Sequence, residues 1–310
     1  MTGRVVVVTP NPAVDVTYDV DRQLVGETLR VREVRRRPGG KGVNVARVLV
    51  SAGVDCTSVL PLGGETGRWV RSSLVRARVD LAAVEIGAAT RTTVTVVDGA
   101  QHPTILTEPG PHVEADEWAH VDRVVARVLV GAAALVVSGS LPPGADPRLV
   151  ARWVRQAREA GVPAFADVSG AALVAAASAG AVLKPNAHEI CEATGAPDEA
   201  AGAMELLERG AACVVVSRGS EGLVARTPSR TVVVPAVAGI SGNPVGAGDA
   251  ATAGLVRATL AGADLADALR QAAAFGAAAV LSPVAGEADA AVAHSLLDRI
   301  PSSHEGASLP

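Results

Sequence analysis

Lysine and asparagine are almost missing from this chain, in which arginine supplies nearly every cationic side chain. The few that occur are Lys41, Lys184, Asn11, Asn44, Asn186 and Asn243. All six lie in stretches rich in glycine or proline at the ends of expected helices and strands, where binding residues concentrate. Because a compact ammonium or a small amide is well suited to contacting a ligand, these stretches are candidates for a binding site.

Cysteine is scarce as well. Cys56, Cys191 and Cys213 are odd in number and lack the spacing of a metal site, which is typical of small core residues in a reducing compartment. No long apolar run begins the chain, since the stretch over residues 5–8 is too short for a signal peptide or a membrane span. We therefore expect a cytoplasmic protein.

An excess of basic charge is also absent. Lysine and arginine together number 28 against 32 aspartates and glutamates, which gives a formal charge of −4. This balance provides no basic face and argues against both nucleic acid and membrane as partners. The 310 residues are 49% hydrophobic and include no stretch that resembles a linker, so we expect a single α/β domain over residues 1–310.

What the chain does contain is an alternation of short β-branched runs with helical stretches. Strands are expected at residues 5–9, 57–60, 81–84, 134–138, 164–167, 182–184 and 213–217. Helices are expected at residues 66–77, 115–130, 147–160, 171–179, 187–194 and 200–209. This order predicts a doubly wound, mostly parallel sheet with helices on both faces. Two segments of alternating pattern, at about residues 16–37 and 91–108, predict a small β-sheet lid.

The stretch from Gly242 to Ala250 carries the strongest chemical signal. A helical run follows it, and a helix N-terminus carries about half a positive charge, so the amides of residues 246–248 would form a phosphate cradle. A carboxylate at Asp249, tolerated beside a bound phosphate, indicates a base that takes a proton from an attacking hydroxyl. The alternative is a capped helix start in which Asp249 is an ordinary N-terminal charge.

Two known nucleotide motifs are approached without being matched. Gly246, Gly248 and Ala251 fit the relaxed dinucleotide fingerprint, but they lie late in the chain and no strand follows them. Residues 38–46 resemble a phosphate-binding P-loop, yet Gly42 stands after Lys41 where serine or threonine is required. We therefore favour an anion or sugar site at residues 38–46.

Three other loops carry candidates, each with a plainer alternative. Asn11 and Asp15 follow the first strand and could hold sugar hydroxyls, with Asp15 accepting two of them, or they could belong to a proline-rich turn. Arg91 is a candidate phosphate clamp or a solvated turn charge. Asn186 and Glu189, three residues apart at a helix start, suit a hydrated Mg²⁺, but a capping box has the same spacing.

Seven short motifs in their order along nearly the whole chain resemble the PfkB, or ribokinase-like, carbohydrate kinases. They are T-x-N-P-A-x-D from residue 9, G-G-K-G-x-N from residue 39, T-R at residues 90–91, S-G-S-L-P from residue 138, K-P-N-x-x-E from residue 184, S-x-G-x-E-G from residue 217 and V-G-A-G-D from residue 245. The resemblance is closest to the branch of 1-phosphofructokinase, tagatose-6-phosphate kinase and the minor 6-phosphofructokinase.

This resemblance implies ATP-dependent phosphorylation of a ketohexose phosphate, with ATP and Mg²⁺ as cofactors and fructose 1-phosphate, tagatose 6-phosphate or fructose 6-phosphate as acceptor. Asp249 would be the catalytic base, beside an anion hole at Gly246, Ala247 and Gly248. The residues implied for the sugar phosphate are Asp15, Gly39, Gly40, Lys41, Asn44, Arg91 and Ser138, with Arg91 and Lys41 holding its phosphate. Those implied for ATP are Lys184, Asn186, Ser217, Gly219 and Gly222. Glu189 would act on Mg²⁺ through water, and the lid would close over the substrates and pair two chains as a homodimer.

The sequence departs from the family pattern at three positions. Pro244 replaces a usual threonine, Ala250 replaces a usual serine, and Leu29 replaces an asparagine common in the fructose-1-phosphate branch, so the identity of the sugar stays open. Two rival functions remain. A kinase of an unphosphorylated sugar or nucleoside in the same superfamily would use the same chemistry, and a non-catalytic sugar-phosphate sensor would not need Asp249.

Overall fold

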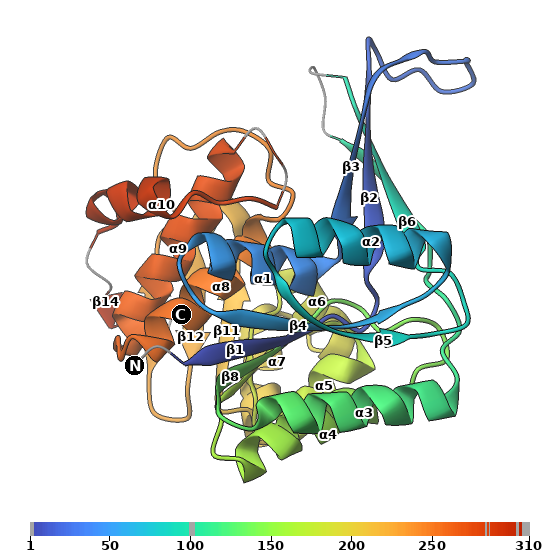
Figure 1. The fold of residues 1–310 in the computed structure, drawn as a ribbon. Coiled ribbons are helices and arrows are strands. Elements are labelled where there is room, and N and C mark those ends of the chain that lie inside the picture. The colour runs from blue at the N-terminus through green and yellow to red at the C-terminus, as the bar shows by residue number, and fades with distance from the viewer. Residues whose placement is uncertain (1–2, 99–102, 283, 285, 302–303, 306–310) are drawn as a thin grey trace.

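The computed structural model describes residues 3–98, 103–282, 284, 286–301 and 304–305. Within them, ten strands form one large sheet in the order β14-β13-β12-β11-β10-β9-β8-β1-β4-β5 (Figure 1). The parallel strands are β1 Arg4–Val8, β4 Cys56–Leu62, β5 Asp80–Glu85, β8 Ala132–Ser138, β9 Ala164–Asp167, β10 Val182–Leu183 and β11 Cys213–Ser217. An antiparallel edge follows with β12 Leu223–Arg226, β13 Thr231–Val234 and β14 His304–Glu305.

Both faces of the large sheet are apolar because its strands are continuous β-branched runs. Along β1, Val5 and Val7 enter one hydrophobic cluster while Val6 and Val8 enter the other. The first cluster is covered by α1 Lys41–Ser51, α2 Gly64–Arg76, α8 Ala247–Leu260, α9 Leu265–Leu281 and α10 Ala290–Leu296. The second is covered by α3 Ala115–Leu129, α4 Arg148–Glu159, α5 Ala171–Ser178, α6 Ala187–Thr194 and α7 Glu199–Glu208. Two short 3₁₀ turns also belong to this body, η1 Gly219–Glu221 and η2 Leu297–Arg299.

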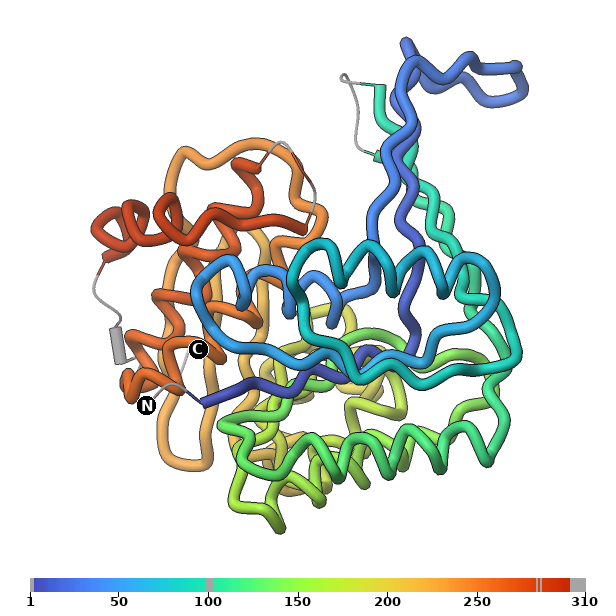
Figure 2. Tube along the Cα trace, viewed as in Figure 1, coloured from blue at the N-terminus to red at the C-terminus, as the bar shows by residue number. Residues whose placement is uncertain are grey.

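A second sheet stands apart from this body and projects from it (Figure 2). Its strands are β2 Ala13–Val20, β3 Val31–Gly39, β6 Arg91–Val97 and β7 Thr104–Thr107, in the order β3-β2-β6-β7. They come from the two segments in which the sequence predicts a lid, of which residues 99–102 lie outside the described residues. That this sheet closes over substrates, and that the chain works as a single domain, stay predictions.

The parallel strands position the functional residues. Since their carboxyl ends share one edge of the sheet, Ser138, Asp167, Lys184 and Ser217, which lie at or just past the ends of four strands, are brought to the same edge. The observed sheet with helices on both faces is the architecture that the sequence predicts. Among the described residues, no helix is both long and apolar enough to span a bilayer.

Candidate active site

The turn before α8 presents backbone donors to the edge of the sheet. Gly246 adopts a left-handed conformation with φ of 85°, which favours glycine, and no side chain caps the helix that follows. The amide of Ala247 donates to the carbonyl of Pro244 at 3.1 Å. The amides of Gly248 and Asp249 find no acceptor among the described residues. A helix start with unsatisfied N–H groups is a ready site for an anion.

Asp249 lies in the first turn of α8 and is only 7% exposed. Its Oδ2 accepts a hydrogen bond from Asn44 Nδ2 at 2.8 Å, which orients the carboxyl group. Burial, and next the charge of Asp167, raise the pKa of Asp249 to about 7. A carboxyl group with this pKa can accept a proton near neutral pH. These surroundings differ from those of an ordinary helix-start charge, which lies in solvent.

Asp167, at the end of β9, holds both lysines of the chain. Its Oδ1 lies 3.2 Å from Lys41 Nζ, and its Oδ2 lies 3.0 Å from Lys184 Nζ and 2.9 Å from Thr252 Oγ1. Burial would raise the pKa of Asp167, but the two ammonium groups outweigh it and lower the pKa to about 2. Asp167 is therefore a carboxylate at every physiological pH, and it fixes two cations at the carboxyl edge of the sheet.

Lys184, which is predicted to contact ATP, lies close to the start of α8. A Cβ atom added at Gly248 would lie 3.7 Å from Lys184 Nζ, so the ammonium faces the start of α8 with no side chain between them. Lys184 is buried, with 5% of its side chain exposed. The ammonium therefore lies close to the residue whose amide has no acceptor among the described residues, where both groups can stabilise negative charge.

Lys41 has neighbours other than those expected for a clamp on the sugar's phosphate. Its Nζ donates to Glu189 Oε1 at 3.0 Å and also forms an ion pair with Asp167. The two carboxylates raise the pKa of Lys41, Asp167 contributing most. The structure thus groups Lys41 with the residues predicted for ATP and Mg²⁺, while its predicted contact with the sugar's phosphate has no counterpart in these bonds.

Asn186 and Glu189 form a complete capping box at the start of α6. Asn186 Oδ1 accepts the amide of Glu189 at 2.8 Å, and Glu189 Oε2 accepts the amide of Asn186 at 2.9 Å. The capping box, one of the two structures predicted from this spacing, is therefore present, but it uses only one oxygen of the Glu189 carboxylate. The other, Oε1, faces Lys41 and the active edge.

The donor set at this edge fits a hydrated Mg²⁺. Asp167 and Glu189 converge on one cation, Lys41 Nζ, so the place between them already accommodates positive charge. Among the described residues, no three potential ligand side chains of histidine, cysteine, aspartate or glutamate lie together. Mg²⁺ suits such a place because it keeps its waters and takes few protein oxygens together with substrate phosphates.

The side predicted for the sugar is built around Asp15 on β2. Asp15 lies opposite Arg37 of β3 in the strand register, and Gly39 packs on its carboxyl group, where an added Cβ would fall 2.1 Å from Asp15 Cγ. Burial raises the pKa of Asp15, and Arg91, Arg37 and Arg47 counteract this in that order. Asp15 is thus a partly buried acceptor surrounded by three arginines.

Arg91, the predicted phosphate clamp, is oriented by backbone carbonyls at the base of β6. Its Nε and Nη2 donate to the carbonyl of Asn11 at 3.3 and 3.2 Å, and its Nη1 donates to the carbonyl of Glu108 at 2.8 Å. One N–H on each terminal nitrogen then has no acceptor among the described residues. A guanidinium held in this way can still bind a phosphate with two donors.

Three buried polar atoms at or after the ends of β1 and β8 have no hydrogen-bond partner in the part of the chain that the structure describes. They are Thr9 Oγ1, Asn11 Oδ1 and Ser138 Oγ. A Cβ added at Gly42 would meet Thr9 Oγ1 at 2.3 Å, and Gly40 has φ of 101°, so glycines bring the start of α1 close to these atoms. Buried polar atoms are normally satisfied, and a bound polar ligand is one way to satisfy them.

Two of the residues predicted for the nucleotide, Asn186 and Ser217, line a shallow depression beside α6, whereas Lys184, Gly219 and Gly222 do not. Asn186, Ser217 and Arg218 are among the residues that line it, and its volume is about 470 Å³. Gly222, with φ of 95°, has no space for a side chain, because a Cβ would fall 2.2 Å from the carbonyl of Val234. Gly219, with φ of 58°, begins η1. These two glycines shape the turn, and their contact with ATP stays a prediction.

Sequence reasoning missed two residues of this site, Asp167 and Thr252. Asp167 could have been noticed because it is a carboxylate at the end of an expected strand, where open α/β sheets bind ligands. Asn11 is predicted, with Asp15, to hold sugar hydroxyls, and this role stays a prediction. Nothing in the local sequence marks Thr252, whose hydroxyl meets Asp167 85 positions away.

Comparison with known proteins identifies the family. The model of the pfkB family carbohydrate kinases matches residues 8–290. The chain belongs to this family. The predicted family and the predicted kinase class are thereby confirmed.

Individual relatives agree with this assignment. The chain is 35% identical over 292 residues to the ATP-dependent 6-phosphofructokinase isozyme 2 of Mycobacterium tuberculosis, covering 90% of this chain and 85% of the relative. It superimposes on phosphofructokinase-2 from Escherichia coli in complex with potassium with a TM-score of 0.89 and 29% identity, covering 96% and 98% of the two chains. A possible 1-phosphofructokinase from Thermotoga maritima shares the fold, with a TM-score of 0.87, 24% identity and coverage of 98% and 100%.

Proposed function

We propose that this pfkB-family kinase transfers the γ-phosphoryl group of ATP to fructose 6-phosphate. The Mycobacterium tuberculosis relative is named a 6-phosphofructokinase, and the Escherichia coli structure has also been obtained in complex with fructose 6-phosphate. Both names agree with the sequence-based prediction of a ketohexose phosphate as acceptor. Arg91, with donors left over, suits a substrate that already carries a phosphate.

One observation carries this proposal: Asp249 is a buried carboxyl group with a pKa near 7 beside unsatisfied helix-start amides. A base that must accept a proton from an alcohol at neutral pH needs such a pKa. A sugar-phosphate sensor would gain nothing from a carboxylate that repels a bound anion. The arrangement therefore favours catalysis over binding alone.

In the proposed reaction the 1-hydroxyl oxygen of the sugar attacks the γ-phosphorus of ATP. Asp249 takes the hydroxyl proton, the new O–P bond forms, and the bond from the γ-phosphorus to the bridging oxygen breaks to release ADP. The amides of Gly248 and Asp249, together with Lys184, stabilise charge on the transferring group. Glu189 and Asp167 would hold a hydrated Mg²⁺, which would supply neutralisation of phosphate charge.

On the sugar side, Asp15 accepts hydroxyls of the sugar and Arg91 holds its phosphate. Closure of the second sheet keeps water from replacing the sugar as acceptor. A cationic site left without its phosphate is costly, so free sugars are poor substrates. Lys41 acts near the transferring group in this proposal, because its ammonium lies between Asp167 and Glu189.

Steady-state kinetics with Mg-ATP and a panel of acceptors test the proposal. The panel contains fructose 6-phosphate, fructose 1-phosphate, tagatose 6-phosphate, ribose and adenosine. We expect kcat/KM for fructose 6-phosphate to exceed that for ribose or adenosine by about 10³-fold or more. Preferred turnover of ribose or adenosine would establish the rival kinase, and tight sugar-phosphate binding without turnover would establish a sensor.

We also infer a homodimer through the lid sheet. Its edge strands β3 and β7 expose Val31, Val34, Ile105 and Leu106, which are between 41% and 59% exposed. Sedimentation velocity of Val34→Asp/Ile105→Asp should show a monomer where the natural chain sediments as a dimer. The control is Val130→Asp, a 76% exposed valine at the end of α3. A natural chain that sediments as a monomer would refute this inference.

The compartment belongs to the same proposal. Cys56, Cys191 and Cys213 are all free thiols in the structure, as expected in a reducing environment. ATP as the phosphoryl donor agrees with the same setting. We infer that the reaction takes place in the cytoplasm.

A further inference from the structure

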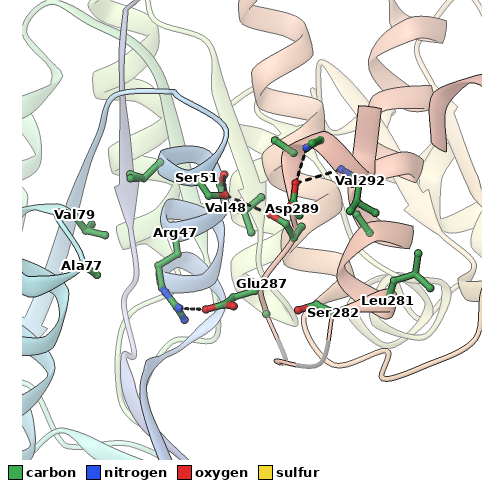
Figure 3. Close-up of a pocket in the computed structure, with 16 residues that line it drawn as sticks. Arg47, Val48, Ser51, Ala77, Val79, Leu281, Ser282, Glu287, Asp289 and Val292 are labelled. Atoms are coloured by element: carbon green, nitrogen blue, oxygen red, sulfur yellow. Dashed lines mark hydrogen bonds and ion pairs between the residues drawn. The ribbon is translucent and has the colours of Figure 1, made fainter. Parts of the chain in front are cut away.

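A cluster of alternating charges joins the lid sheet, α1 and the segment that follows α9. Arg37 of β3 and Arg47 of α1 both pair with the same atom, Glu287 Oε1, and the Arg47 contact measures 2.5 Å. Figure 3 shows the Arg47–Glu287 pair at one end of a cavity of about 880 Å³. Asp15 is the fourth member, since it lies opposite Arg37 and both arginines act on its pKa.

The chain neighbour of Glu287 contacts the catalytic machinery. The amide of Gly286 donates to the carbonyl of Val245, in the turn that precedes α8, at 3.1 Å. Gly286 also packs on the amide group of Asn44, where an added Cβ would lie 2.8 Å from Asn44 Oδ1. Asn44 in turn orients Asp249. Glu287 is therefore linked to the proposed base, Asp249, through Gly286 and Asn44. On its other side, Arg37 lies between Glu287 and Asp15, the proposed sugar-binding carboxylate.

A contribution to the stability of the fold does not explain why these ion pairs are present. The side chains of Glu287, Arg37 and Arg47 are 45%, 21% and 18% exposed, and ion pairs that solvent reaches add little to the stability of a fold. Their position is more informative. They connect β3 and α1, which are neighbours in the sequence, to the segment before α10, which lies 250 positions from Arg37 and 240 from Arg47.

Electrostatics explains what Glu287 does for Asp15. Arg37 and Arg47 repel each other, and Arg47 contributes to lowering the pKa of Arg37 after burial. Glu287 neutralises this repulsion and draws both guanidinium groups toward itself. Without its charge, the attraction of the two arginines to Asp15 goes unopposed, and Asp15 would be turned from an acceptor of sugar hydroxyls into an ion-pair partner.

We propose that Glu287 is a positioning residue for the phosphosugar reaction. It keeps Arg37 and Arg47 from capturing Asp15, and through Gly286 it keeps the sugar side aligned with Asn44 and Asp249. This inference rests on the proposed function, because it concerns the sugar that Asp15 binds. It adds to that function a control of sugar affinity by a residue that touches neither substrate.

The test compares Glu287→Gln, Arg37→Gln and the double variant by steady-state kinetics with fructose 6-phosphate and ATP. Glu287 lines an open cavity, so glutamine fits in its place without a clash and the variant removes only the charge. Glu205→Gln is the matched control, since Glu205 also pairs with an arginine, Arg209, in a partly exposed ion pair on α7.

We expect Glu287→Gln to raise KM for fructose 6-phosphate about tenfold, to leave KM for ATP within about twofold, and to lower kcat by a smaller factor. The thermal midpoint should equal that of the Glu205→Gln control. The double variant should be no worse than Glu287→Gln, because Arg37 acts on Asp15 through the same cluster. Arg37→Gln reports the same coupling should Glu287→Gln fold poorly.

Three results would overturn the inference. In the first, Glu287→Gln keeps the natural KM for the sugar phosphate. In the second, both KM values rise together with a fall in thermal midpoint, which is the mark of a structural role. In the third, the effects of Glu287→Gln and Arg37→Gln multiply in the double variant. A natural chain that phosphorylates no sugar phosphate would instead defeat the proposed function itself, whereas an active chain with an unchanged Glu287→Gln defeats this inference alone.

Discussion

The two halves of the candidate site are built differently. On the transfer side, Asp167, Lys184 and Asp249 have little exposed surface and lie on the ends of β9, β10 and the start of α8. On the sugar side, Asp15 and Arg91 are partly exposed and lie on strands of the second sheet. One half is part of the core of the molecule, and the other is attached to it.

In the proposed function, the buried residues act on the transferring phosphoryl group, and the partly exposed residues select the sugar phosphate. Buried charges held by the large sheet need no rearrangement when the phosphoryl group moves, which is what electrostatic stabilisation requires. Partly exposed groups on a separate sheet can be altered without loss of the core. Changes on the transfer side should therefore act on kcat or stability, and changes on the sugar side on KM for the sugar phosphate.

The largest effect is expected from Asp249→Asn on the transfer side. The amide keeps the size and the hydrogen-bonding position next to Asn44 but cannot accept the proton. We expect kcat to fall by ~10²–10⁴-fold, with sugar binding by calorimetry nearly unchanged. Retention of more than about 1% of the natural kcat would remove Asp249 from the role of general base.

Asp167→Asn should test whether the buried cations depend on one carboxylate. It leaves Lys184, which is 5% exposed, without its partner, so we expect a loss of about 3–5 kcal/mol in the free energy of unfolding by urea. Thr252→Val is the control, because it removes only a hydroxyl, which bonds to Asp167 and to the carbonyl of Gly248, and should cost about 1 kcal/mol. Equal losses in the two variants would contradict the account.

On the sugar side, Gly39→Ala should displace Asp15 while leaving the core intact. The added Cβ would lie 2.1 Å from Asp15 Cγ, so the carboxyl group has to move. We expect kcat/KM for fructose 6-phosphate to fall by about 10²-fold, mostly through KM. At Gly87 the added Cβ would meet only Glu117 Oε1 at 3.7 Å, and Gly87→Ala should be active like the natural chain.

The smallest of these effects is expected from Arg91→Ala. Loss of one guanidinium should raise KM for the sugar phosphate about tenfold and leave KM for ATP and kcat within about twofold. Arg71→Ala, at an exposed arginine of α2, is the control for a change of net charge. An unchanged KM for the sugar phosphate would exclude Arg91 from the phosphate clamp.

The sequence was informative wherever the signal is local. Alternating apolar runs predicted the large sheet and its helices, because parallel strands buried on both faces need such runs. The Asn186–Glu189 spacing predicted either a capping box or a hydrated Mg²⁺ site; the structure has the capping box, and the metal site stays a prediction. The glycine turn before α8 was readable for the same reason, since a left-handed residue there favours glycine.

Contacts between segments far apart in the chain could not be predicted from the sequence. Lys41 was expected at the sugar's phosphate, but its ammonium meets Asp167 126 positions away, a contact set by which strand ends meet at the edge of the sheet. The pairing of Arg47 with Glu287 spans 240 positions. Such pairs depend on the packing of α1, β9 and the segment after α9, and no local pattern encodes that packing.

The central claim is that a carboxyl group with a raised pKa accepts the proton of the sugar hydroxyl. Its most direct test is the pH dependence of kcat/KM for fructose 6-phosphate in the natural chain and in Asp167→Asn. Because Asp249 must be ionised to act and its pKa is about 7, kcat/KM should fall about tenfold per pH unit below that value. Removing the charge of Asp167 lowers the pKa of Asp249, so kcat/KM should begin to fall at a lower pH in the variant. Ionisation of the substrate affects both proteins equally and therefore does not change this difference. A natural chain whose kcat/KM stays constant from about pH 8 down to about pH 5 would contradict the account.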